Sequence, residues 1–152
     1  MAAVDYFLKI DGVEGESLDE KHKGEIEVES FSWGIDATDD KGNVSGPVDV
    51  SDFHFTMRMS KASPVLMQAC ATGEHIKSAR FTGRHAGGDS QFEFIKIELD
   101  QILIGLYRTA GGGDELPMEE ISLNFGTAAI AFTSQGADGK PGETTKAFIK
   151  YK

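Results

Sequence analysis

The chain has 152 residues, with 25 acidic and 15 basic side chains and a formal net charge of −10. A charge of this sign disfavours binding to nucleic acids and insertion into anionic membrane surfaces, because both attract Lys and Arg. The single cysteine excludes an internal disulfide framework, and no apolar run approaches the roughly 18 residues of a membrane-spanning helix. The length predicts one domain over residues 1–152.

The N-terminal part of the chain predicts two strands. Residues 4–10 alternate between apolar and mostly polar side chains, which is typical of a half-buried strand. A second strand begins at Ile26, and its apolar positions change parity before Phe31 and Trp33. A parity change inside one strand usually marks a β-bulge, which we expect near Ser30.

A long polar segment and a helix follow. Residues 36–49, DATDDKGNVSGPVD, are more than a simple connection needs, so they form either a functional loop or a disordered surface loop. After an alternating strand at 53–59 comes the only convincing helix. Ser63 is expected to cap this helix, Pro64 suits its first position and Gly73 ends it.

The rest of the chain predicts strands and turns. The segment 92–106 changes parity more than once and must bend or bulge, and glycine-rich turns at 111–113 and 136–143 separate the last strands. Strands at this spacing predict an all-β (mainly β) sandwich or barrel, here with one short α-helix.

No pattern in the sequence points to catalysis. The histidines are far apart in the chain, lack the spacing of a zinc site and are expected to be dispersed surface or strand residues: His22, His54, His75 and His85. Cys70 falls in the apolar stripe of the helix, where we expect a small buried side chain and not a nucleophile. No EF-hand spacing or G-x-S-x-G motif is present. The sequence therefore predicts no enzyme, cofactor or metal site.

Two features have open interpretations. Arg80 and Arg84 share a strand parity and could bind a phosphate or carboxylate, although solvation or pairing with neighbouring acids is the commoner role. Ser32 lies between Phe31 and Trp33, which are expected in the core, and so points to the opposite face. On a solvated face Ser32 would be ordinary, whereas on a channel wall it would contact a molecule in the channel.

Several stretches of the sequence share their order and spacing with one protein family. They are VDYFLKIDGVEGES, EIEVESFSWG, SPVLMQACATGEH, HAGGDSQFEFIKIEL, EISLNFG and TSQGADGK. Each stretch alone is weakly specific, but together they run nearly from end to end. In them the chain resembles the Hcp family, the ring-forming tube proteins of the type VI secretion system.

This resemblance implies a compact β-barrel of two packed sheets with one helix against its side. Six copies would form a ring, and rings would stack into a tube that a contractile sheath expels. The implied partners are further copies of the chain, the trimeric spike protein VgrG, the sheath, and effector proteins held and protected in the lumen. Assembly in the bacterial cytoplasm and secretion without a cleaved signal peptide follow, since the N-terminus lacks the basic and apolar regions of such a peptide.

The resemblance also implies functional residues. Ser32 matches the serine that the family places between two aromatic residues, and would face the lumen and contact cargo. The segment 36–49 would contact a neighbouring subunit or ring through a set of polar residues: Asp39, Asp40, Lys41, Asn43 and Ser45. Two alternative functions stay open, a monomeric β-sandwich that binds a ligand such as a carbohydrate, and a small hydrolase.

Overall fold

The computed structural model describes residues 4–38, 41–85 and 92–150, and in this part of the chain it has eleven strands and one helix. The strands are β1 (Val4–Ile10), β2 (Ile26–Val28), β3 (Ser30–Ser32), β4 (Ile35–Thr38), β5 (Val44–Val50), β6 (Phe53–Arg58), β7 (Ile76–His85), β8 (Glu93–Ala110), β9 (Met118–Asn124), β10 (Thr127–Gln135) and β11 (Pro141–Lys150). The helix α1 spans Ser63–Thr72. The mainly β fold predicted from the sequence, with one short helix, is confirmed.

One strand, β8, joins the two halves of a large antiparallel sheet. The sheet has the order β2-β1-β7-β8-β9-β6-β3, and β10 and β11 are attached beside β8. The first part of β8, Ile95–Asp100, pairs with β10, and the later part, Leu103–Ala110, pairs with β9. Gln101 lies between these parts with a positive φ of 58°, which is uncommon for a residue other than glycine. The predicted bend in this segment is therefore a change of partner strand.

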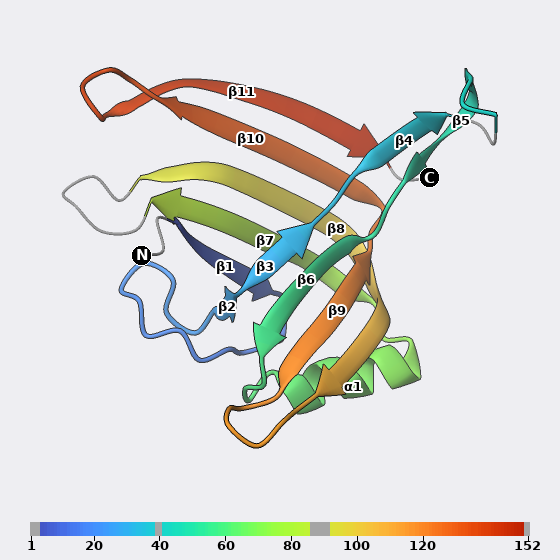
Figure 1. The fold of residues 1–152 in the computed structure, drawn as a ribbon, viewed down its shortest axis with the longest axis vertical. Coiled ribbons are helices and arrows are strands. Elements are labelled where there is room, and N and C mark those ends of the chain that lie inside the picture. The colour runs from blue at the N-terminus through green and yellow to red at the C-terminus, as the bar shows by residue number, and fades with distance from the viewer. Residues whose placement is uncertain (1–3, 39–40, 86–91, 151–152) are drawn as a thin grey trace.

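A second change of partner occurs between β2 and β3. β2 pairs with β1, whereas β3 pairs with β6 at the other end of the strand order. The prediction of a β-bulge near Ser30 is wrong. The parity changes there because the chain leaves β1 and joins β6 at Glu29. Through the bend in β8 and the crossing at Glu29, the sheet curls over a common core, as Figure 1 shows.

Aromatic rings from both halves of the sheet fill this core. The centroid of Phe81 lies 4.6 Å from that of Phe31 and 5.1 Å from that of Phe53. Tyr6 of β1 meets Phe31 edge to face at 5.2 Å. Alternate residues of β6 are fully buried, as the predicted strand at 53–59 requires. These contacts hold β1, β3, β6 and β7 at fixed positions relative to one another.

The helix packs beside β8, at the bottom of Figure 1. Its N-cap is Ala62, so the prediction that Ser63 caps the helix is wrong. The Ser63 hydroxyl is instead buried, where it accepts a hydrogen bond from the backbone N–H of Ser60 and donates one to Glu119. Gly73 ends the helix with a left-handed φ of 67°, as predicted.

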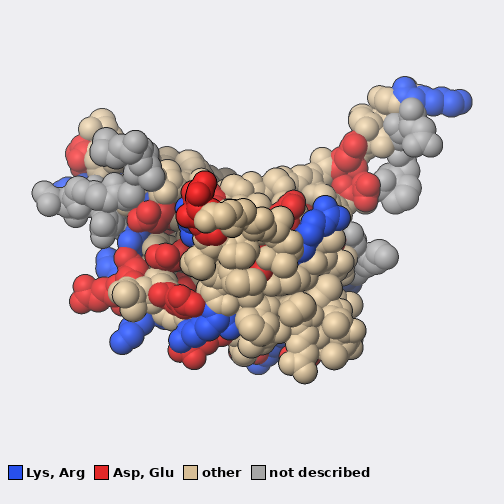
Figure 2. Space-filling view, turned by 60° about the horizontal axis from the view of Figure 1, so that its bottom comes forward, with Lys and Arg blue, Asp and Glu red and all other residues tan. Residues whose placement is uncertain are grey.

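The polar segment after β3 forms an arm. β4 and β5 pair with each other in a separate two-stranded sheet that projects from the body (Figures 1 and 2). Both interpretations of residues 36–49 as a loop are thus corrected, because much of this segment is a hairpin with Ile35 opposite Val50. In the part of the chain that the structure describes, no helix is long and apolar enough to cross a membrane.

Candidate functional site

The outward face of β3, β6 and β9 is a polar surface. Side chains alternate between the two faces of a strand, and the inward ones on these strands are apolar with the exception of Glu119. The outward residues next to one another in this surface are Ser30, Ser32, His54, Thr56, Glu120 and Ser122. We call these six residues the polar wall.

Ser32 lies at the edge of the polar wall, opposite His54 of β6. It is exposed, while Phe31 and Trp33 on either side are partly buried against the core, so the expected orientation of Ser32 is confirmed. Trp33 packs edge to face on Phe125 at 5.8 Å. The strand therefore presents a small hydroxyl on a rigid backbone.

Hydrogen bonds fix the other side chains of the wall. His54 Nδ1 lies 2.9 Å from Ser122 Oγ, and His54 Nε2 lies 3.5 Å from a Glu120 carboxylate oxygen. Ser30 Oγ and Thr56 Oγ1 are 2.7 Å apart. Hydroxyl and imidazole groups both donate and accept hydrogen bonds, so the wall can meet polar protein surfaces of many shapes.

His54 contacts both Ser122 and Glu120, as the histidine of a hydrolase triad contacts a serine and an acid. The backbone and the exposure of these residues do not support that chemistry. β9 is paired with β6 on one side and β8 on the other, so its backbone N–H groups are used in the sheet and cannot form an oxyanion hole. The three side chains also lie on the outward face of β6 and β9, where Glu120 is exposed and His54 and Ser122 are only partly buried, so water has access to them.

Behind the wall, a buried carboxylate connects the sheet to α1. Glu119 is fully buried and accepts hydrogen bonds of 2.5 Å from the Ser63 hydroxyl and from the Tyr107 hydroxyl. Burial, together with the nearby carboxylate, raises the pKa of Tyr107 to about 12. Sequence analysis missed this group, although Glu119 shares the parity of the buried Ile121 and Leu123.

A second buried polar group holds the connection between β1 and β2. His22 is only 4% exposed. Its Nδ1 lies 3.1 Å from Glu25, its Nε2 lies 2.9 Å from Glu93, and its ring stacks on Phe7 at 4.4 Å. The expectation of dispersed surface or strand histidines is therefore wrong for His22, because the nearby Glu25 and the distant Glu93 both bind its ring inside the structure.

Arg84 completes the same cluster. Its buried guanidinium binds both carboxylate oxygens of Asp19, lies 3.5 Å from Asp5 and covers the Phe7 ring at 5.0 Å. The guanidinium lowers the pKa of Asp19 below its usual value of 3.8. Arg80, by contrast, is exposed, so the two arginines do not form one ligand site and Arg84 takes the commoner role of pairing with acids.

The other predicted residues lie on the arm or outside the described part of the chain. Lys41 and Asn43 are exposed at the far end of the arm. Asp39 and Asp40 fall outside the described residues, as does the side chain of Ser45. Cys70 is partly buried against the core, as expected. Among the residues described, no group of three or more His, Cys, Asp or Glu could hold a metal ion.

Comparison with known proteins decides the family. A family model described as "Type VI secretion system effector, Hcp" matches residues 7–132, which is most of the chain. The chain belongs to the Hcp family. The protein hcp1 of Pseudomonas aeruginosa is 39% identical over 142 residues, covering 90% of this chain and 88% of that protein.

Solved structures agree with this assignment. Hcp1 from Salmonella typhimurium superposes with a TM-score of 0.82 at 33% identity, covering 99% of this chain and 96% of that one. A type VI secretion system effector from Yersinia pestis gives a TM-score of 0.79 at 32% identity, covering 96% and 99%. This Hcp protein is therefore a secreted component of the type VI secretion system, and a structural protein, not an enzyme.

Proposed function

We propose that six copies of this chain close into a ring and that rings stack into a tube with effector proteins in its lumen. A contractile sheath would expel the tube, and the VgrG spike would sit at its tip. The observation that carries this proposal is the polar wall, a surface of short, hydrogen-bonded side chains with Ser32 at its edge. Six such walls in a circle would line a channel without binding any one cargo too tightly.

The sheet supplies a physical reason to form a ring. Among the described residues, β3 pairs only with β6 and β11 only with β10, so each has one open edge. Open strand edges bind other chains, and a contact between two different surfaces of the same chain gives a closed ring when its rotation closes. The arm, with Ile35, Val44 and Val48 at least half exposed, would contact the neighbouring subunit or ring.

The rest of the proposal concerns where the chain works. It acts as one domain over residues 1–152, assembles in the cytoplasm, and leaves the cell through the contractile machine without a cleaved signal peptide. The net charge of −10 disfavours insertion into an anionic membrane.

Mass in solution tests the assembly. Six chains of 16.4 kDa give 98.4 kDa, and negative-stain images of that species should show annular particles with an open centre. A monomeric ligand-binding sandwich predicts 16.4 kDa at every concentration. The only tryptophan, Trp33, packs on Phe125 and is therefore not free to serve as the aromatic platform that such a module often uses. Single chains at high concentration, with no rings, would refute the proposal.

A further inference from the structure

We propose that Leu18 is the side chain by which one ring binds the next, entering a shallow, partly apolar pocket at the opposite end of a second copy of this chain. The inference rests on the proposed function, because it takes stacked rings as given. It adds the two surfaces that meet when rings stack.

Leu18 is held outside the core by its immediate neighbours. It is 89% exposed, the highest value among the large apolar side chains of the described residues. Ser17 before it is buried, and its carbonyl accepts a hydrogen bond of 2.9 Å from the Gly24 N–H. Asp19 after it is bound by both terminal nitrogens of Arg84. Leu18 therefore stands at a fixed point.

The loop around Leu18 is also fixed at its far end. His22 is buried between Glu25 and Glu93 and stacks on Phe7, which ties the loop to β1 and β8. A single exposed leucine on a loosely attached loop is ordinary. Here, turning Leu18 inward would break the pair between the buried Arg84 guanidinium and the partly buried Asp19 carboxylate, at an energetic cost. The structure therefore maintains the exposure of Leu18.

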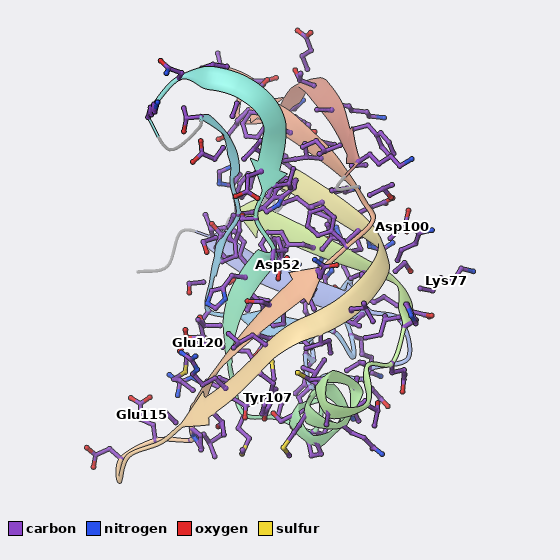
Figure 3. All side chains as sticks on the ribbon, turned by 90° about the vertical axis from the view of Figure 1, so that its right-hand side faces the viewer. Asp52, Lys77, Asp100, Tyr107, Glu115 and Glu120 are labelled. Atoms are coloured by element: carbon purple, nitrogen blue, oxygen red, sulfur yellow. The ribbon has the colours of Figure 1, made fainter. Side chains whose placement is uncertain are left out.

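A partly apolar pocket lies at the other end of the molecule. It has a volume of about 670 Å³ and is lined by Ile76, Leu103 and Phe125 together with the polar residues His75, Lys77, Gln101 and Asn124. Lys77 lies at its rim, on the side of the molecule that Figure 3 shows. In Figure 1 the loop between β1 and β2 is at the left, whereas the start of β7 and the junction of β9 with β10 are at the right.

A projection at one end and a recess at the other suit head-to-tail stacking. Two different patches at opposite ends of one chain make a heterologous contact, which repeats without closing when the copies are related by translation. Six identical contacts would act together at each junction between rings, so a weak single contact suffices. Lys77 at the pocket also offers a cation to the acidic flank of Leu18, where Glu20 is exposed.

A Leu18→Ser variant tests the projection without touching its anchors. Rings of 98.4 kDa should still form, but reaching the stack length of the parent should need at least about a thousandfold more protein, because a buried leucine is lost at each of the six contacts of a junction. Val65→Ser is the matched control, since Val65 is 44% exposed on α1 and lies in neither surface. Stack length is measured by sedimentation velocity and negative-stain microscopy.

A cross-link tests the pocket. In a Cys70→Ala background, Glu20→Cys combined with Lys77→Cys leaves Leu18 in place and should give disulfide-linked ladders when stacked rings are oxidised, and neither single cysteine variant should. Stacked rings without a ladder overturn the assignment of the pocket. Normal stacking by Leu18→Ser, or equal loss in Val65→Ser, overturns the role of Leu18 while the ring survives. A parent that forms no rings overturns the proposed function and this inference together.

Discussion

Glu119 shows how one buried charge can organise a boundary between elements. Its carboxylate lies inside the molecule, none of the described basic side chains binds it, and two hydroxyl donors from α1 and β8 take the place of water. A buried acceptor without these donors would cost several kcal/mol. The pair of hydrogen bonds therefore sets the position of α1 against the back of the polar wall.

The Tyr107 hydroxyl, which donates a hydrogen bond to Glu119, makes the stability of the fold depend on pH in the alkaline range. The pKa of Tyr107 is raised from 10.0 to about 12, so the folded chain holds this proton where the unfolded chain has lost it. The stabilisation is complete below pH 10 and disappears as the pH rises towards 12. Tyr107→Phe lacks this contribution, and its deficit in unfolding free energy relative to the parent should shrink over that interval.

Urea denaturation of both chains at pH 8, 10 and 11.5 measures this difference. At pH 8 we expect the variant to be less stable by about 1 kcal/mol, since a hydrogen bond to a charged acceptor is lost. Ionisable groups that both chains share contribute equally to the two unfolding free energies, so their contributions cancel in the difference. A deficit that stays constant from pH 8 to 11.5 would show that the Tyr107 hydroxyl does not couple folding to pH.

Ser32 tests the polar wall at the scale of one residue. Ser32→Glu should weaken retention of a co-expressed effector protein while leaving the ring intact, because six added carboxylates would line the proposed channel and resist desolvation. Co-purification of the effector with the ring measures retention. Ser32→Ala is the control, since it removes the hydroxyl without adding charge or bulk. An effector retained equally by the Ser32→Glu ring would reject the lumen assignment.

At the scale of elements, strand alternation was predictable and strand partners were not. The buried apolar positions of β6 and β9 follow directly from their sequence parity, whereas in β1 Phe7 is buried next to Leu8, against the alternation. At Glu29 and Gln101 the parity change was visible, but a local pattern cannot distinguish a bulge from a change of partner strand. The partner is set by contacts between segments that are far apart in the chain.

The same limit applies to the candidate sites. The orientation of Ser32 could be predicted, because it depends only on parity beside Phe31 and Trp33. The His22 cluster could not, because Glu93 lies 71 residues away in sequence. The arm was hidden for another reason: its strands are rich in polar and turn residues, so no apolar alternation identified them.

Deleting residues 39–45 tests the arm. The deletion should leave the monomer folded, because the β4–β5 sheet is separate from the large sheet, but should impair assembly. Thermal unfolding should shift by only a few degrees, which corresponds to about 1 kcal/mol in a chain of this size. Sedimentation should show fewer or shorter assemblies. The double variant Lys41→Ser, Asn43→Ser is the control. It removes polar side chains but keeps the length of the arm, so comparing it with the deletion shows whether lost contacts or shortening impairs assembly. Normal rings and stacks from the deletion variant would exclude a role for the arm.

At the scale of the whole molecule, charge opposes the assembly that the shape favours. Acidic side chains gather at the left of Figure 2, the side where the chain connects β1 to β2. This connection, residues 11–25, contributes six of the 25 acids: Asp11, Glu14, Glu16, Asp19, Glu20 and Glu25. Six chains of −10 give a ring of −60, and stacked rings bring such charges together. Apolar contacts such as that of Leu18 must therefore outweigh repulsion between rings.

The dependence of stacking on salt concentration distinguishes repulsion between charges from attraction through apolar contacts. Repulsion between exposed charges is screened over about 8 Å at 0.15 M and about 3 Å at 1 M, whereas apolar contacts persist. Raising NaCl from 0.05 to 0.5 M at constant pH should therefore lengthen the stacks, and sedimentation velocity measures their length. Sucrose at matched osmolality is the control for solute effects without screening. Stacks that shorten or stay the same as salt rises would mean that attraction between opposite charges, and not apolar contact against net repulsion, holds the rings together.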